Sequence, residues 1–161
     1  MSAVFEISVM SKKNIQRDIL FEAFKRKGLS LEIDLIEVID NWKYENEVIL
    51  DNNISTTVLD DYVINGKIIM LDGLIDTKYR CGYHSELKRN NTYLTDFWVS
   101  LEYLPDLDVD NITLENVIFY ETVTDEIIKL RDKYEIELCG MGVELFMEYS
   151  QSIGSTILKS K

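Results

Sequence analysis

Cys81 and His84 form the sharpest catalytic pattern in the sequence, because a thiolate and an imidazole three residues apart could act as nucleophile and general base. His84 is the one histidine of the 161-residue chain. Asp76 or Glu86 could supply the third group that orients such an imidazole. A Cys-x-x-His spacing also arises by chance, and a buried cysteine beside an exposed histidine is the more common arrangement. We therefore assign no catalytic residue and keep an enzyme of unrecognised type, using Cys81 and His84, as an alternative.

Motifs for metals and cofactors are incomplete in this sequence. Asp106, Asp108 and Asp110 match the first three ligands of an EF-hand loop. However, Asn111 replaces the glycine that the loop needs, and Val117 stands where its bidentate glutamate belongs. Two isolated cysteines and one histidine cannot complete a structural zinc tetrahedron without a carboxylate. A P-loop, a Gly-x-Ser-x-Gly elbow and a GxGxxG fingerprint are also missing. We therefore expect no metal and no cofactor.

The charge of the chain is concentrated in two acidic segments. The formal net charge is −12 at pH 7. Residues 30–62 carry a net charge of −8, and residues 90–128 carry −9 without a lysine or an arginine. Such a field repels nucleic acid and anionic membranes and attracts basic partners. We therefore expect a basic protein partner, and no nucleic-acid or membrane partner.

Length, cysteine content and the N-terminal residues bound the organisation and the compartment. A chain of 161 residues with one proline and no linker-like stretch is typical of a single globular domain, here residues 1–161 with a tail that frays from about residue 150. The first residues do not have the pattern of a signal peptide, and no apolar stretch approaches the roughly 18 residues of a membrane span. Two cysteines are too few for a disulfide framework. These features predict a cytoplasmic protein.

Large aromatic residues are interleaved with the acids of both segments. Aromatic anchors surrounded by charge are typical of interface hot spots. Acidic residues would speed the encounter with a basic partner, and the aromatic residues would hold it. Trp42 and Tyr44 lie in an irregular acidic stretch and are the strongest candidates. The residues that we predict to bind the partner are Trp42, Tyr44, Glu45, Asp60, Asp61, Tyr62, Glu102, Tyr103, Asp106, Asp108 and Asp110.

In size, acidity, lone histidine and strand-rich α+β pattern, the chain resembles the bacterial immunity proteins of contact-dependent inhibition and other polymorphic toxin systems. The resemblance implies a cytoplasmic antitoxin that binds one toxin domain stoichiometrically. Many toxins of these systems are nucleases with basic grooves, which an acidic protein could occlude. We therefore expect a stoichiometric inhibitor that binds and neutralises a cognate basic toxin domain, and a nuclease is the toxin class that we expect. Another acidic interaction protein, such as a phage DNA mimic or an adaptor, stays open as an alternative.

The order of predicted elements indicates an α+β fold, with a mostly antiparallel β-sheet and two main helices packed on one face. Apolar residues at helical spacing predict a helix that Ser11 caps at its start and Gly28 ends. A second helix is predicted to begin after Thr124, which is followed by two acidic residues that suit a helix N-terminus.

Strand predictions rest on alternation of apolar and polar residues and on turn signals. The Asn65-Gly66 dipeptide predicts a type I′ turn that joins strands over residues 56–64 and 67–71. Residues 72–94 are polar and predict mostly loop. Further strands are predicted over residues 3–9, 29–35 with a continuation past a bulge to Ile39, 96–103, 112–122, 136–139 and 143–149.

Overall fold

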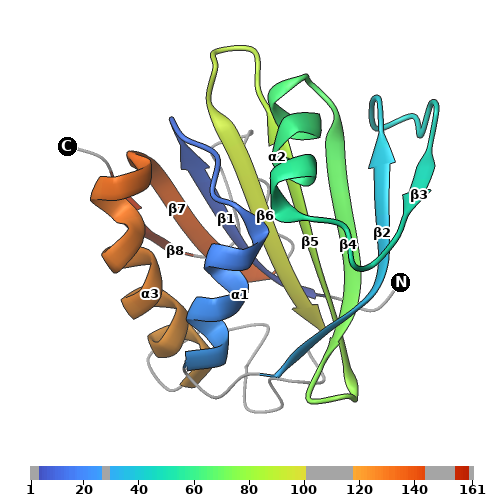
Figure 1. The fold of residues 1–161 in the computed structure, drawn as a ribbon. Coiled ribbons are helices and arrows are strands. Elements are labelled where there is room, and N and C mark those ends of the chain that lie inside the picture. The colour runs from blue at the N-terminus through green and yellow to red at the C-terminus, as the bar shows by residue number, and fades with distance from the viewer. Residues whose placement is uncertain (1–3, 27–29, 101–117, 144–154, 160–161) are drawn as a thin grey trace.

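An antiparallel sheet of eight strands forms the body of the computed structural model, which describes residues 4–26, 30–100, 118–143 and 155–159 (Figure 1). The strands are β1 (Val4–Ser11), β2 (Leu31–Ile39), β3 (Val48–Leu50), β4 (Ile68–Ile75), β5 (Tyr79–Leu87), β6 (Tyr93–Ser100), β7 (Ile136–Val143) and β8 (Ser155–Lys159). Their order across the sheet is β3-β2-β4-β5-β6-β1-β7-β8, and every neighbouring pair is antiparallel. The first strand of the chain therefore lies inside the sheet, between β6 and β7.

Three helices cover one face of this sheet in the described part of the chain (Figure 1). They are α1 (Arg17–Arg26), α2 (Thr56–Ile64) and α3 (Ile118–Tyr134). The predicted α+β class, with a mostly antiparallel sheet and helices on one face, is thus confirmed, with one helix more than the two expected. None of the described helices is long and apolar enough to span a membrane.

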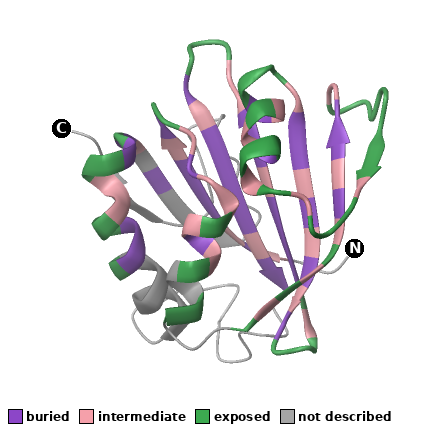
Figure 2. Ribbon diagram, viewed as in Figure 1, coloured by how far each residue is buried: buried purple, intermediate pink, exposed green. Residues whose placement is uncertain are grey.

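The two faces of the sheet differ in chemistry because successive side chains of a strand point to opposite sides. On the helix-covered face, Phe5 and Ile7 of β1 stand opposite Val99 and Phe97 of β6, and all four are buried in the core. We call the opposite side the far face. Figure 2 shows buried residues along the middle of the strands and exposed residues in the connections at their ends.

Helix α1 starts later than the sequence predicts. Ser11 is fully buried at the end of β1, where it pairs with Tyr93, so its hydroxyl is not available as an N-cap and donates instead to the backbone oxygen of Lys13 at 2.7 Å. The helix begins at Arg17 and carries Lys25 in its last turn, as the dipole favours. The helix itself is confirmed and its predicted cap is wrong, because pairing with β6 extends the strand.

Residues 56–64 form α2, so the predicted hairpin is wrong. Ser55 is the N-cap, and its hydroxyl accepts a hydrogen bond from the backbone of the first turn at 3.3 Å. Asn65 is the C-cap, and Gly66 has a φ of 87°, the left-handed conformation that commonly ends helices. The Asn-Gly pair therefore ends a helix before β4 and does not join two strands.

Residues 79–87 form strand β5, where the sequence predicted loop. Its inward side chains, including Cys81 and Tyr83, are buried, while its other side carries polar residues on the far face. Because one side is polar and the other includes serine and cysteine, β5 has no apolar run that identifies it from the sequence.

Three predictions near the C-terminus are also wrong. Residues 118–122 belong to α3 and not to a strand. Residues 136–143 form one continuous strand, β7, where the sequence predicted a strand over 136–139, a turn, and a second strand from 143. The strand continues because both glycines of the segment stay in register beside β1. Residues 155–159 form β8, which pairs with β7, where a frayed tail was expected.

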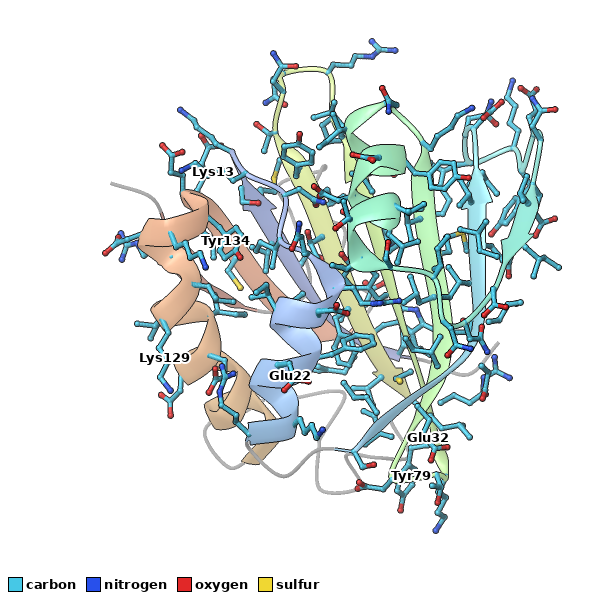
Figure 3. All side chains as sticks on the ribbon, viewed as in Figure 1. Lys13, Glu22, Glu32, Tyr79, Lys129 and Tyr134 are labelled. Carbon is cyan, nitrogen blue, oxygen red and sulfur yellow. The ribbon has the colours of Figure 1, made fainter. Side chains whose placement is uncertain are left out.

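Helix α3 is tied to the first third of the chain by polar contacts. Arg26 at the end of α1 reaches the fully buried carboxylate of Glu126 at 3.1 Å, and Lys129 approaches the same carboxylate at 3.3 Å. At the C-terminal end of α3, the backbone of Lys13 donates to the backbone oxygen of Tyr134 at 3.3 Å, and Figure 3 shows these two residues close together. These contacts fix α1 and α3 side by side on the sheet.

Candidate interaction surface

The connection between β2 and β3, residues 40–47, is a tightly hydrogen-bonded loop that we call the aromatic loop. The amide of Asn41 donates to Glu45 at 2.8 Å, and the amide of Asn46 donates to Asp40 at 2.7 Å. The backbone of Tyr44 donates to Asn41 at 2.9 Å. Tyr44 and Asn46 adopt left-handed conformations with φ of 60° and 53°. Non-glycine residues hold such φ values only where their surroundings enforce them, so the loop has a defined shape.

Asp40 anchors the aromatic loop to the segment that follows α2. Its carboxylate forms an ion pair with Lys67, and the hydrogen bond from Asn46 together with this ion pair lowers the pKa of Asp40. Figure 1 shows the β2–β3 connection and the C-terminal end of α2 at the same end of the sheet. The contact therefore joins these two neighbouring segments across 27 residues of sequence.

Trp42 is held on the far face by two residues of β5. Its indole N–H donates to the Glu86 carboxylate at 2.7 Å, and its ring meets the ring of His84 edge-on, with centroids 5.0 Å apart. Glu86 is buried and also pairs with Lys88. Trp42 nevertheless stays 47% exposed. The ring is thus fixed in orientation while about half of its surface faces solvent.

Beneath Trp42, three neighbouring strands align a row of polar side chains on the far face. The strand register places His84 of β5 opposite Asp96 of β6, and Asp96 opposite Ser8 of β1. Asp96 is only 6% exposed; it accepts a hydrogen bond from Ser8 at 2.6 Å, and its other oxygen lies 3.4 Å from Nδ1 of His84. Burial raises the pKa of Asp96, against the opposing effects of the His84 charge and the Ser8 hydroxyl.

The order of contacts in this row limits its chemistry. In a serine-hydrolase triad the histidine contacts the serine, and the aspartate lies behind the histidine. Here Asp96 lies between Ser8 and His84, so the contacts orient the imidazole and do not activate the hydroxyl. We therefore interpret the row as the support of Trp42.

The pairing of Cys81 with His84 that the sequence suggested is wrong. In β5, Cys81 points into the core opposite Val99, whereas His84 belongs to the far face. Residues three apart in a strand point to opposite sides, so the thiol and the imidazole are separated by the sheet. Burial raises the pKa of Cys81 to about 12, which keeps it a thiol at neutral pH.

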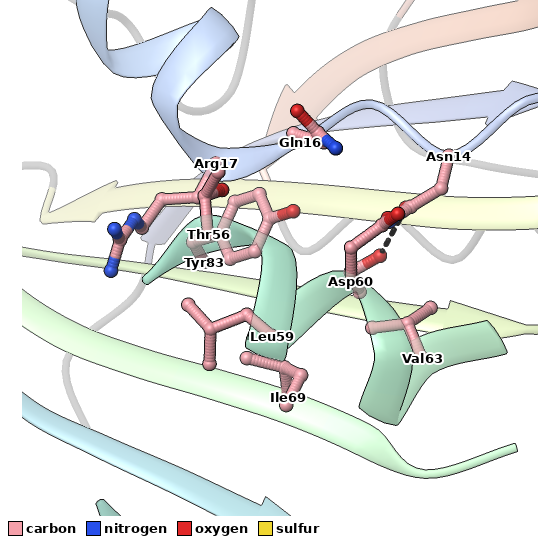
Figure 4. Close-up of a pocket in the computed structure, with 10 residues that line it drawn as sticks. Asn14, Gln16, Arg17, Thr56, Leu59, Asp60, Val63, Ile69 and Tyr83 are labelled. Carbon is pink, nitrogen blue, oxygen red and sulfur yellow. Dashed lines mark hydrogen bonds between the residues drawn. The ribbon is translucent and has the colours of Figure 1, made fainter. Parts of the chain in front are cut away.

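The three predicted residues of α2 have different environments. Asp61 is exposed, and Tyr62 is partly buried against the core. Asp60 accepts a hydrogen bond from Asn14 at the edge of a crevice of about 10 Å³, room for one water molecule, between α2 and the start of α1 (Figure 4). Ser85 donates to the same asparagine at 3.0 Å. Asp60 is therefore used within the fold, and Asp61 is the acid of this group that faces solvent.

Next to the aromatic loop, an acidic patch lies on the far-face side of β2. A hydrogen bond to Glu47, burial, and the charges of Glu47 and Asp72 raise the pKa of Glu37 to about 7. Edge strand β3 places Ile49, 68% exposed, directly opposite Glu37. An apolar side chain therefore stands beside carboxylates that repel one another, and a positive charge would relieve that repulsion.

The structure brings together part of the predicted binding set. Trp42, Tyr44 and Glu45 share the aromatic loop, and Asp61 belongs to α2, whose C-terminal end lies at the same end of the sheet. Five of the predicted residues, Glu102, Tyr103, Asp106, Asp108 and Asp110, lie outside the described residues. Sequence reasoning missed Glu86 and His84, which hold Trp42, because their position beneath it depends on the register of distant strands and leaves no local signal in the sequence.

Two further observations bear on what this surface could bind. Among the described residues, no group of three or more histidine, cysteine, aspartate or glutamate side chains is arranged to hold a metal ion. The chain matches no protein-family model, no curated protein and no solved structure. The fold is thus defined as α+β with a mostly antiparallel sheet, and the function must be argued from the surface itself.

Proposed function

We propose that the chain is a stoichiometric protein inhibitor of the immunity type, which acts in the cytoplasm and binds a basic toxin domain through the aromatic loop and its acidic surroundings. The observation that carries the proposal is the fixed shape of this loop, which keeps Trp42 and Tyr44 about half exposed, at 47% and 50%. Tryptophan and tyrosine are enriched among the residues that dominate binding energy at interfaces.

Preorganisation supports a binding role for the loop. Association normally costs free energy to order loops and side chains. Trp42 is already oriented by Glu86 and His84, and Tyr44 sits in a backbone conformation fixed by loop hydrogen bonds. A partner that docks here would therefore meet one aromatic side chain, Trp42, that is already ordered, and a second, Tyr44, on a backbone that is already fixed.

Charge supports a basic partner. Residues 40–51 carry four acids and one lysine, and the far face beside them adds Glu37 of β2 and Asp72 of β4. A surface of one sign accelerates encounter with a partner of the opposite sign and makes the association rate sensitive to salt. A nuclease domain offers such a partner, because its substrate groove must attract phosphates.

A DNA mimic or an adaptor is the second candidate, and the number of partners separates it from an immunity protein. A DNA mimic relies on general charge and binds many DNA-binding proteins. An immunity protein relies on a shaped hot spot and binds one. The defined geometry of the aromatic loop favours an immunity protein that binds one partner.

The first experiment captures partners on the tagged chain from lysate of the cell that produces it, at low salt and at high salt. We expect one basic protein in a 1:1 complex whose toxic or nuclease activity the chain blocks when equimolar. Capture of several unrelated DNA-binding proteins would favour the mimic, and a captured protein whose activity stays unaffected would contradict inhibition.

Matched variants then locate the surface. Trp42→Ala and Tyr44→Ala should each weaken the complex by about 2 kcal/mol, roughly thirtyfold, as hot-spot residues do. Ile128→Ala removes an equally exposed apolar side chain on α3 and should have no effect. Glu45→Gln should slow association and reduce its salt dependence, whereas Asp132→Asn on α3 should not. Equal effects of loop and α3 variants would place the interface elsewhere.

A further inference from the structure

A groove lies between α1 and β2. Its volume is about 540 Å³, within the range of small-molecule sites. Its walls come from α1, from the start of β2 and from Asn52 in the segment that precedes α2. Neither Trp42 nor Tyr44 lines it, so it is separate from the proposed interaction surface.

Arg17 gives this groove a buried cation with unused hydrogen-bonding capacity. Its side chain is only 10% exposed; Nε donates to Asp18 at 2.9 Å, and Nη2 reaches the backbone oxygen of Ile54 at 3.4 Å. Nη1 is buried and has no hydrogen-bond partner among the described residues. Figure 4 shows the guanidinium pointing away from the Asn14–Asp60 pair. A buried donor without an acceptor is costly, so an anionic oxygen at this position would be favoured.

The floor of the groove is apolar. Phe21, Leu31 and Ile33 line it, and the same three residues also border a second cavity of about 10 Å³ that extends towards Cys81 and Phe97 in the core. The floor is therefore not tightly filled from below. An apolar chain or ring of a ligand that lies on these side chains would bury its own apolar surface and theirs.

The rim sets the charge of the ligand. Lys25 lies at the groove beside Glu22, and Arg17 lies beside Asp18, so each cation has a carboxylate as its neighbour. One anionic group can be bound by Arg17, whereas a multiply charged ligand would meet the two carboxylates.

We propose that the groove between α1 and β2 binds a small carboxylic acid in its anionic form, with the carboxylate on Arg17 and an apolar chain or ring on Phe21, Leu31 and Ile33. The carboxylate would accept hydrogen bonds from the Arg17 guanidinium where it lines the groove, and a turn of the side chain would bring the buried Nη1 within its reach. Because the site uses none of the aromatic loop, it does not depend on the function proposed above.

The test uses 4-phenylbutyrate as the probe and 4-phenylbutan-1-ol as its uncharged counterpart, each titrated into the full-length ¹⁵N-labelled protein. We expect saturable shifts of the amide signals of Phe21 and Ile33 with the carboxylate, and at least about tenfold weaker binding of the alcohol. Equal affinities, or no saturation with the carboxylate at millimolar concentration, would overturn the proposal.

Variants separate the two halves of the site. Arg17→Gln should weaken 4-phenylbutyrate about tenfold or more while leaving the alcohol unchanged, and Arg89→Gln, which removes an exposed arginine in the β5–β6 connection, should change neither. Ile33→Trp should fill the groove and abolish binding of both probes, which keeps the proposal testable if Arg17→Gln does not fold. Full affinity in either groove variant would refute the assigned site.

Discussion

Replacing Trp42 by phenylalanine tests whether the aromatic loop is fixed to the sheet as described. The change keeps a ring beside His84 and removes the N–H that donates to Glu86 at 2.7 Å. Glu86 is buried, and among the described residues it keeps its ion pair with Lys88 after this change. A hydrogen bond to a charged group contributes about 1.5–3 kcal/mol, and because Trp42 is half exposed we expect the lower limit, about 1.5 kcal/mol of lost stability.

The assay is a double-mutant cycle that combines Trp42→Phe with Glu86→Gln. Urea unfolding followed by circular dichroism gives the free energy of unfolding of each variant, and we expect a coupling energy of about 1 kcal/mol or more. In thermal unfolding, the loss in Trp42→Phe corresponds to roughly 3–6 °C for a chain of this size.

A control cycle pairs Glu86→Gln with Trp98→Phe. Trp98 lies in β6 opposite Gly82, four residues along β5 from Glu86 and therefore about 13 Å away. We expect these two changes to be additive. Additivity within about 0.3 kcal/mol in the Trp42 cycle would refute the argument, because it would mean that the indole and the Glu86 carboxylate do not interact in solution.

Three further predictions concern the sheet and the buried groups. Gly73→Ala should destabilise the protein by about 1–3 kcal/mol in urea unfolding, because its Cβ would lie 2.1 Å from a backbone oxygen of β2; a neutral effect would contradict the close approach. The pKa of Glu37 is raised to about 7, so its favourable contribution to stability is complete below pH 4.5 and is lost as the pH rises through 7. Glu37→Gln should therefore stabilise the protein more at pH 8 than at pH 5. An equal effect at the two pH values would contradict the contact with Glu47. Cys81 and Cys139 should resist iodoacetamide at pH 7.5 in the native protein and react in urea, because burial raises both thiol pKa values to about 12; native labelling at the rate of a free thiol would contradict this.

Sequence patterns predicted the strands whose two faces differ in polarity. Strand β1 was predicted from its β-prone residues and β2 from its alternation, both close to their observed positions. The bulge in β2, which was predicted after Leu35, falls between Ile33 and Leu35. Strand β5 could not be found in this way, because Arg80, His84 and Glu86 make its far-face side polar while its inward side has no continuous apolar pattern.

The prediction for residues 56–64 failed because one dipeptide serves two structures. Asn65-Gly66 suits a type I′ turn, and the same left-handed preference of glycine suits a helix end. Ser55 at the N-cap and the buried pair Leu59 and Val63, four residues apart, are the signals that favoured a helix. Five β-branched residues in the segment have weak helix propensity, which packing against β4 and β5 overrides.

For the candidate surface, the sequence could predict which residues are available for binding but not which residues hold them in place. Trp42 and Tyr44 were expected to be available because they stand among acids in an irregular stretch, and both are about half exposed. The residues beneath them follow from register. Ser8 and Asp96 are 88 residues apart, and a shift of one residue in either strand would move one of them to the other face.

The central position of β1 has a consequence for how the chain is made. β1 needs β6 on one side and β7 on the other, and Phe5 pairs with Val143 more than 130 residues later. At about 5–20 residues per second, β7 is synthesised roughly 7–28 s after β1. The meander of β4, β5 and β6 can pair soon after its synthesis, whereas β1 must wait for a strand that follows it by more than 130 residues. Completion of the sheet therefore waits for β7, and a ribosome that stops before β7 leaves one edge of β1 unpaired.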